Sequence, residues 1–128
     1  MVESLGRHEF YVGAAIMCTK GAEARKLYIV EDGLVAMQSD VGNGASASVR
    51  VLSSSEAFGW SALVPPYLVT ATAVALTDTH LLAIQREALL RLMRAEPSLG
   101  LAILQNLSAV MSLRLRRLEK ELLELARR

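Results

Sequence analysis

The residues that are best candidates for catalysis or ligand binding lie between Phe58 and Thr77. In that stretch, Gly59-Trp60-Ser61-Ala62-Leu63 partly matches the sharp turn that exposes a nucleophilic serine in some hydrolases, but the second glycine of that turn is missing. Beyond Asp78 and His80, no acid and histidine follow in the order that such a serine requires. The chain also has no Walker loop and no dinucleotide-binding glycine pattern. We therefore expect a protein that is not an enzyme.

The same stretch has the features of a turn that binds an anion. Its first residues are long enough for a single helical turn, whose N-terminus presents unpaired backbone N–H groups that suit a phosphate. Gly59 lets a ligand approach the backbone closely, and hydroxyl groups follow at Ser61, Thr70 and Thr72. The stretch contains no Lys, Arg, Asp or Glu. A pocket built from these residues is therefore apolar, with hydroxyl groups as its polar part.

Metal and thiol chemistry receive little support from the sequence. His8 and His80 are far apart in the chain and have no cluster of Cys, Asp or Glu at ligand spacing, so we expect no metal site and no cofactor. Cys18 is the single cysteine and fits a small hydrophobic residue of the core better than a redox centre. Trp60 is the single tryptophan and fits a buried aromatic residue or lid, with a stacking platform for a planar ligand as the alternative.

Composition and charge bound the class of protein. The chain has 128 residues, which suits one domain, and a formal net charge of +1, which makes a strong electrostatic grip on nucleic acid or anionic lipid unexpected. Apolar stretches such as 71–76 fall far short of the ~20 residues that a spanning helix needs. The first residues lack the basic-then-apolar layout of a signal peptide. We expect a cytoplasmic protein with no membrane contact.

Short apolar runs separated by turns dominate the first 84 residues. Glu31-Asp32-Gly33 is a hairpin signal, because glycine takes the positive φ that tight turns demand. In the stretch 45–52, small apolar residues including Val49 and Val51 alternate with polar ones, which predicts a half-buried strand. Such closely spaced strands favour a sandwich or barrel over parallel units. The expected strands cover residues 8–12, 14–19, 27–30, 34–38, 45–52, 71–77 and 79–84.

Helical periodicity dominates the last 40 or so residues. One helix is expected over 86–95, and Pro97 marks a break before a second helix that runs toward Arg128. At ~1.5 Å per residue the second helix is about 45 Å long, and its apolar seam predicts a parallel homodimer. The residues of this expected dimer interface are Leu104, Leu107, Met111, Leu115, Leu118, Leu122 and Leu125.

Several motifs follow one another in a specific order along the chain. They are Gly13 and Gly21, the stretch 27–33 that ends in glycine, Phe58-Gly59 with Ser61-Ala62-Leu63, the stretch 70–78, and Ala95-Glu96-Pro97. Together they resemble the cyclic nucleotide-binding domain, the module of catabolite activator proteins, protein kinase A regulatory subunits and some ion channels. The resemblance implies one domain over 1–128 with a mainly β plus α fold. An antiparallel, jelly-roll-like β-roll (1–84) would be followed by two C-terminal helices (85–128), the last one long.

The resemblance also implies a ligand-binding cassette. In the family, a glutamate after the Phe-Gly pair binds the ribose and an arginine before the Ser/Thr-Ala pair binds the phosphate. Counted without gaps, these positions are Trp60 and Val69 in this chain. Tight binding of cyclic AMP or cyclic GMP is therefore not expected. The cassette residues that the resemblance implies are Phe58, Gly59, Trp60, Ser61, Ala62, Leu63, Val69, Thr70 and Ala71.

The implied function is a non-catalytic sensory or regulatory module in signal transduction. Occupancy by a small-molecule or nucleotide ligand of unknown identity would be transmitted through the C-terminal helix to an attached output domain. Direct contact of this chain with nucleic acid is not expected, because acidic residues are mixed with the basic ones on that helix. Two alternatives stay open: a ligand-free structural dimerisation domain, and a transcription regulator of the catabolite-activator class truncated before its DNA-binding region.

Overall fold

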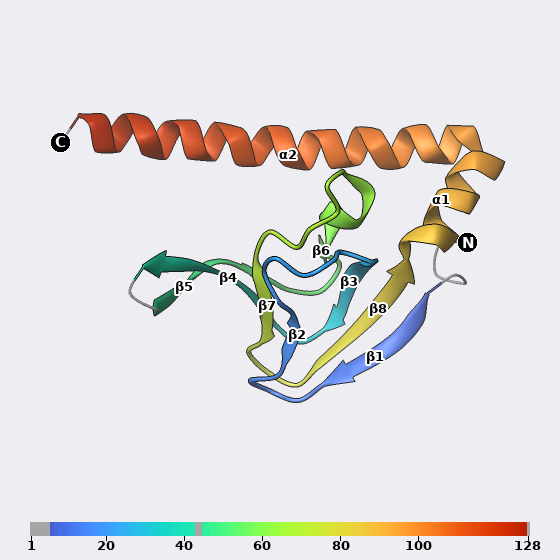
Figure 1. Cartoon of the computed structure of the whole chain (residues 1–128), viewed down its shortest axis with the longest axis horizontal. Helices are drawn as coiled ribbons and strands as arrows, with labels where there is room; N and C mark the ends of the chain where they lie inside the picture. The colour runs from blue at the N-terminus through green and yellow to red at the C-terminus, as the bar shows by residue number, and fades with distance from the viewer. Residues whose placement is uncertain (1–5, 43–44, 128) are drawn as a thin grey trace. The chain divides into compact units, whose positions relative to one another are not determined.

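The computed structural model describes residues 6–42 and 45–127, with the side chains of 40–49 left out. Eight strands and one short 3-10 turn precede two helices (Figure 1). In chain order the elements are β1 (Arg7–Tyr11), β2 (Ile16–Cys18), β3 (Lys26–Asp32), β4 (Val35–Gly42), β5 (Ala45–Leu52), β6 (Ala57–Phe58), η2 (Trp60–Leu63), β7 (Thr72–Ala75), β8 (Thr79–Gln85), α1 (Arg86–Ala95) and α2 (Pro97–Ala126).

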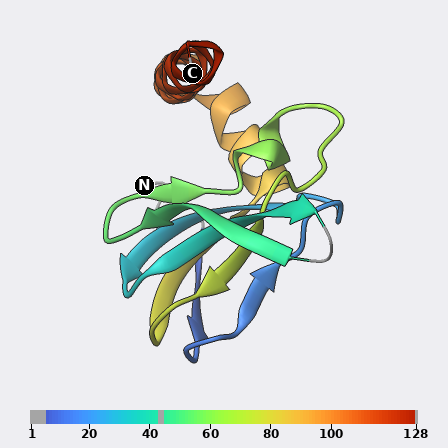
Figure 2. The same ribbon diagram turned by 90° about the vertical axis from the view of Figure 1, so that its left-hand side faces the viewer.

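The strands form two antiparallel sheets with the orders β1-β8-β3-β6 and β2-β7-β4-β5. The pairing is nested, since β1 pairs with β8, β2 with β7, β3 with β6 and β4 with β5. Figure 2 shows the strands of both sheets gathered into one roll. The expectation of an antiparallel β-roll followed by two helices, the last one long, is confirmed.

The expected hairpin at Glu31-Asp32-Gly33 is wrong, because β3 and β4 belong to different sheets. The turn carries the chain from one sheet to the other. Gly33 has a φ of +100°, and a Cβ built on it would lie 2.6 Å from the carbonyl oxygen of Asp78. Glycine is needed here both for its backbone conformation and for the close approach of the turn before β8.

The strand expected over 45–52 is confirmed, but the residue buried at its end is not the one that the alternation predicts. Val51 is 49% exposed whereas Leu52 is 2% exposed, so the apolar face expected from the alternation does not hold at Val51. The register explains the change: Met37 pairs with Arg50 and Gln38 with Ser48, which leaves one extra residue in β5 as a bulge. A bulge shifts the two-residue period by one. The side chains of 45–49 lie outside the described residues.

The core lies between the two sheets and is filled by side chains from both. Phe58 of β6 is 1% exposed and stacks on Tyr28 of β3, with ring centroids 4.8 Å apart and 15° between the planes. Burial, with smaller contributions from the charges of Glu9 and Cys18, raises the pKa of Tyr28 to about 12. The core cluster consists of Tyr28, Val30, Val35, Met37, Leu52, Phe58, Ala73, Leu81 and Ala83.

The chain divides into two compact units, with the boundary between Leu89 and Leu90. The expected break at Pro97 is confirmed, because α1 ends at Ala95 and α2 begins with that proline. A Cβ built on Gly100 would lie 3.0 Å from the carbonyl oxygen of Met93, so glycine lets the first turn of α2 pack closely against α1.

Helix α2 is long and apolar enough to cross a membrane by length and composition alone, with a mean hydropathy of 1.3 over its most apolar window, of which 11% is buried. This helix was not among the apolar stretches considered from the sequence, although residues 97–113 contain no Lys, Arg, Asp or Glu. A single helix of this kind is weak evidence for a membrane span, because only its length and composition point to one.

Gly33→Ala is expected to lower the free energy of unfolding by about 2 to 4 kcal/mol, because alanine adds left-handed strain to a clash with backbone. Gly21→Ala is the matched control: Gly21 has a φ of +90°, but a Cβ there meets nothing within 4 Å. Gly21→Ala should lower the free energy of unfolding by about 1 kcal/mol. Urea unfolding followed by circular dichroism measures both values, and equal losses would contradict the proposed clash.

Candidate functional site

The turn η2 is the centre of the expected cassette. Gly59 precedes it with φ 84° and ψ 21°, and no side chain caps its N-terminus. Inside the turn, the N–H of Ala62 donates to the carbonyl of Gly59 at 3.1 Å and the N–H of Val64 donates to the carbonyl of Ser61 at 3.3 Å. These bonds leave the first N–H groups of the turn without a partner inside it, which is the arrangement that suits an anion.

Gly59 is required by the packing of the fold, which was not predicted from the sequence. A Cβ built on it would lie 2.6 Å from the carbonyl oxygen of Lys26 and 3.3 Å from Cδ2 of Tyr28. The glycine therefore allows the start of the cassette to pack directly on β3. The close approach of a ligand is therefore not needed to explain this glycine, because the packing on β3 is sufficient to require it.

The expected cassette residues differ in burial. Phe58 is 1% exposed and Ala62 is fully buried, and Ala71 packs against the same core cluster. Side chains in such positions support the fold. The residues left with accessible surface are Trp60, Ser61, Leu63, Val69 and Thr70, of which Thr70 is exposed and the others are half-buried.

The segment that follows the turn is held by the chain between β2 and β3. The N–H of Val69 donates to the carbonyl of Ala22 and its carbonyl accepts from the N–H of Gly21, both at 2.8 Å. The hydroxyl of Thr72 accepts a hydrogen bond from the N–H of Lys20 at 3.0 Å. One of the three hydroxyl groups expected to line a pocket therefore already has a partner within the fold.

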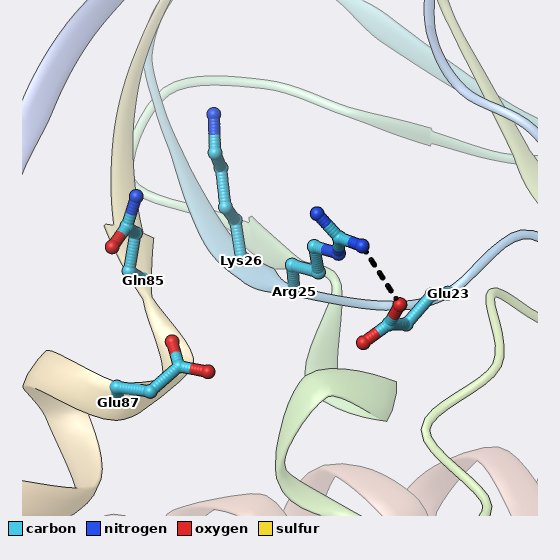
Figure 3. Close-up of a pocket in the computed structure, with 5 residues that line it drawn as sticks. All are labelled: Glu23, Arg25, Lys26, Gln85 and Glu87. Carbon is cyan, nitrogen blue, oxygen red and sulfur yellow. Dashed lines mark hydrogen bonds and ion pairs between the residues drawn. The ribbon is translucent and has the colours of Figure 1, made fainter.

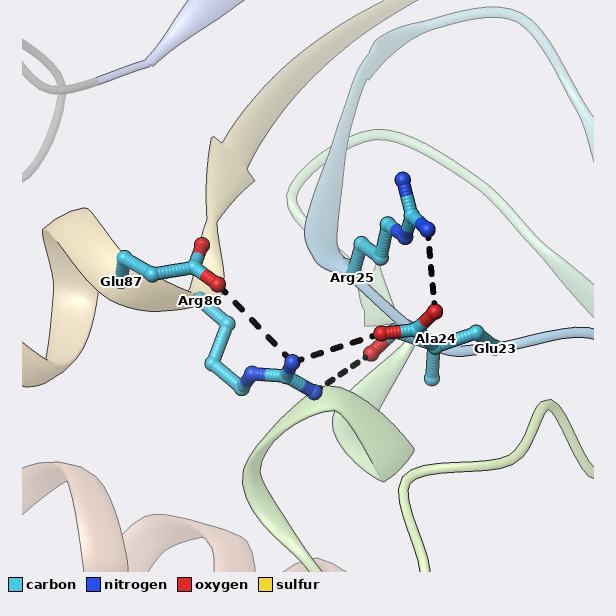
Figure 4. A network of polar contacts seen from close by, with 5 residues as sticks. All are labelled: Glu23, Ala24, Arg25, Arg86 and Glu87. Atoms are coloured by element: carbon cyan, nitrogen blue, oxygen red, sulfur yellow. Dashed lines mark hydrogen bonds and ion pairs between the residues drawn. The ribbon is translucent and has the colours of Figure 1, made fainter.

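Arg86 forms a polar network that sequence reasoning did not find (Figure 4). Its Nη1 donates to the carbonyl of Ala24 at 3.0 Å, and its guanidinium lies 4.6 Å from the ring centroid of Tyr67. Its Nη2 lies 3.7 Å from Oε1 of Glu23 and 3.8 Å from Oε1 of Glu87. The side chain of Arg86 is 17% exposed, so most of this charge is shielded from water.

The network joins three segments that are distant in sequence. Tyr67 lies just after the cassette turn, Glu23 lies before β3, and Arg86 is the first residue of α1. The N–H of Ala24 also donates to the carbonyl of Tyr67 at 2.7 Å. A hydrogen bond from Arg25, helped by its charge, lowers the pKa of Glu23 below its ordinary value. No local signal marked Arg86, because Glu23 and Ala24 are more than sixty residues away in sequence and Tyr67 lies on the far side of β7 and β8.

Two hollows in the described part of the chain are polar and contain no cassette residue. The larger has a volume of about 340 Å³ (Figure 3). Its lining consists of Glu23, Arg25, Lys26, Gln85 and Glu87. The smaller has a volume of about 220 Å³. Its lining consists of Arg7, Glu9, Lys26, Ala83, Gln85 and Ala88. The apolar cassette pocket stays a prediction.

Glu9 connects strands that are not neighbours in the sheet. Its carboxylate accepts hydrogen bonds from Nζ of Lys26 at 2.8 Å and from the hydroxyl of Tyr11 at 2.7 Å. Burial alone would raise the pKa of Glu9, but the hydrogen bonds from Lys26 and Tyr11 lower it below its ordinary value. Burial and the hydrogen bond to Glu9 raise the pKa of Tyr11 strongly. This network ties the edge strand β1 to β3 across β8.

The expected dimer seam on α2 is mostly exposed. Leu118 and Leu122 are 55% and 65% exposed, and Leu104, Leu115 and Leu125 are exposed as well. Leu107 is 6% exposed and Met111 is half-buried. Five of the seven leucine and methionine side chains are therefore free to meet a partner. The interface itself stays a prediction.

Comparisons with known proteins agree on one family. The model of the cyclic nucleotide-binding domain matches residues 8–96. The chain is 34% identical over 103 residues to the cyclic AMP receptor protein of Thermus thermophilus, a match that covers 80% of this chain and 46% of that protein. This chain thus spans about half the length of that relative.

The chain is also similar in structure to solved proteins. The crystal structure of the catabolite activator protein of Thermus thermophilus matches with a TM-score of 0.85 and 30% identity, over 98% of this chain and 57% of that one. The N-terminal domain of a transcriptional regulator from Streptomyces coelicolor matches with a TM-score of 0.75 and 25% identity, over 90% of this chain and 79% of that one.

Arg86→Lys is expected to lower the free energy of unfolding by about 1 to 2 kcal/mol, because lysine keeps the charge but loses the planar fork and the contact with Tyr67. Arg25→Lys is the matched control. The Arg25 side chain is 73% exposed and forms a surface ion pair with Glu23. Its replacement should change stability by less than about 0.5 kcal/mol. Urea unfolding compares the two, and an equal effect of both variants would contradict a special role for Arg86.

Proposed function

The chain belongs to the cyclic nucleotide-binding domain family, and from this premise we propose that it is a non-catalytic sensory module whose ligand state is read through its C-terminal helices. The observation that carries the proposal is the family match over residues 8–96, which spans all but the first residue of the β-roll and includes the η2 turn. The matched relatives named above are a cyclic AMP receptor and a catabolite activator protein, which supports a regulatory role. We expect the module to work in the cytoplasm.

The ligand is proposed to bind at the cassette around η2, but tight binding of cyclic AMP or cyclic GMP is not expected. Trp60 stands where the family has glutamate and Val69 where it has arginine. Each charge-assisted hydrogen bond contributes about 1.5 to 3 kcal/mol, so the loss of two costs roughly 3 to 6 kcal/mol. That corresponds to about 10² to 10⁴ in affinity.

A route for the signal follows from the polar network. A ligand that shifts η2 also displaces Tyr67, which is bonded through its carbonyl to Ala24 and through its ring to Arg86. Arg86 is the first residue of α1, so the displacement reaches the helix directly. The ligand shifts the equilibrium between two arrangements only by the difference in its affinity for them.

Two further candidates rest on specific observations. The similarity to the Thermus cyclic AMP receptor protein favours the sensory part of a transcription regulator. The missing cassette charges favour a structural dimerisation domain without a ligand. In both cases α2 would pair with α2 of a second copy, because each buried leucine contributes ~1.5 to 3 kcal/mol.

Cyclic AMP and cyclic GMP are expected to bind with Kd values weaker than about 10 μM, and Val69→Arg should tighten binding by roughly 10-fold or more, because it restores one charged contact. Trp60 is the only tryptophan, so its emission reports binding directly, and calorimetry gives the affinity. Val69→Leu is the matched control, since it changes the same position without adding charge, and it should leave binding unchanged.

The outcomes separate the candidates. A Kd below about 10 μM for the natural sequence would contradict the argument from the missing charges. Trp60 emission that is blue-shifted, shielded from soluble quenchers and unmoved by a panel of nucleotides and metabolites would favour the structural dimerisation domain over the sensor.

Leu118→Asp is expected to dissociate the dimer without unfolding the β-roll, because a carboxylate in the seam must lose its water on pairing. Leu123→Asp is the matched control, since Leu123 is 58% exposed but lies off the seam. Light scattering with size exclusion measures the mass of both variants. A natural chain that stays monomeric at high concentration would remove the dimer proposal.

A further inference from the structure

The fold brings the only two histidines of the chain into direct contact. His8 lies on β1 and His80 on β8, which pair antiparallel with His8 opposite Leu82 and Phe10 opposite His80. The two histidines are therefore diagonal neighbours on one face of the sheet. Nδ1 of His8 lies 2.7 Å from Nε2 of His80. A separation of 72 residues concealed this pair from sequence reasoning.

The pair is accessible and its rings are held in place. His8 is exposed and His80 is half-buried, with the ring centroids 4.8 Å apart. Phe10 stacks on His80 at 4.4 Å with 17° between the ring planes, and the phenylalanine itself is 74% exposed. The aromatic contact limits rotation of His80, while both ring nitrogens remain within reach of an ion from solvent.

We propose that His8 and His80 form a two-histidine site for one divalent late transition-metal ion, Cu²⁺ or Ni²⁺ in preference to Zn²⁺. Metal–nitrogen bonds of about 2.0 to 2.1 Å place two ligands about 2.9 Å apart at a right angle and about 3.4 Å apart in a tetrahedron. The observed 2.7 Å separation belongs to the hydrogen-bonded, metal-free pair and is shorter than both, so the rings must move apart slightly to admit an ion, least for the right angle. Square-planar and tetragonal geometry is typical of Cu²⁺ and Ni²⁺, and the general affinity order places Cu²⁺ highest.

The protons balance without a further reactant. In the contact, one of the two facing nitrogens carries a hydrogen and the other accepts it. When the ion binds, that hydrogen is replaced at the facing nitrogen and a proton is taken up by the other nitrogen of the same ring. Both imidazoles then remain neutral and each gives one lone pair to the ion.

The site is open. Among the described residues, no group of three or more His, Cys, Asp or Glu gathers around one point, so water completes the coordination. An open two-ligand site exchanges its ion readily and differs in this from the closed four-ligand sites that are purely structural. Because β1 pairs only with β8 in its sheet, the bound ion would fasten this edge strand to its single neighbour. The proposal does not depend on the cassette or on its ligand.

The test is a titration of the untagged full chain with Cu²⁺, Ni²⁺, Zn²⁺ and Mg²⁺ in a buffer that does not bind metal. We expect one Cu²⁺ per chain, weaker Ni²⁺ and Zn²⁺, no Mg²⁺, and a rise of about 5 to 10 °C in melting temperature near saturation. His8→Gln and His80→Gln should each weaken Cu²⁺ binding roughly 10²-fold, because the second ligand no longer acts at high effective concentration.

Two controls keep the result specific. Arg7→Gln alters the neighbour of His8 on β1 and keeps both imidazoles, and Cys18→Ser removes the only thiol, so both variants should bind Cu²⁺ like the natural chain. Electron paramagnetic resonance of the natural chain needs no variant and should show two imidazole nitrogens on Cu²⁺. No saturable binding below about 10⁻⁴ M, a spectrum with one nitrogen, or binding that survives either histidine change would overturn the site.

Discussion

The packing of the β6–η2 segment on β3 is the constraint on which the rest of the fold depends. Phe58 stacks on Tyr28 in the centre of the core, and one residue later Gly59 places its backbone against the carbonyl of Lys26. A side chain at Gly59 would push the cassette turn off the sheet. This contact therefore fixes both the filling of the roll and the place where the cassette begins, so the same residues serve stability and the candidate site.

Local sequence patterns predicted the helices and strands. The pairing of the strands and the contacts between distant side chains could not be predicted from those patterns. The periodicity gave α1 and the bounds of β5, because both depend on neighbours along the chain. The turn at Gly33 was misread as a hairpin, since a positive φ is equally suited to a turn between two sheets. The contacts of Arg86 and the His8–His80 pair were not predicted, because residues far apart in sequence leave no spacing signal.

The charge of Arg86 does not replace the arginine that the cassette lacks at Val69. Its guanidinium is 17% exposed and already holds the carbonyl of Ala24 and the ring of Tyr67. To meet a phosphate it would have to abandon a buried carbonyl, which costs about 1 to 3 kcal/mol for the group left without a partner. The charge of Arg86 is thus committed to the fold, and this supports the proposal of a ligand less charged than a cyclic nucleotide.

The sequence of α2 helps to decide whether its exposed leucines pack against a second helix or insert into a membrane. Residues 97–113 are uncharged but include Gln105, Asn106 and Ser108, and from Arg114 onward charged residues are interleaved with the leucines. A membrane span needs ~20 predominantly apolar residues on all sides, and polar side chains at its centre are costly. A paired helix needs only an apolar seam and gains from charges on its flanks. Leu118 and Leu122 lie in the charged part, so their burial requires a partner helix with water on its other faces, and this favours the pairing proposal over insertion.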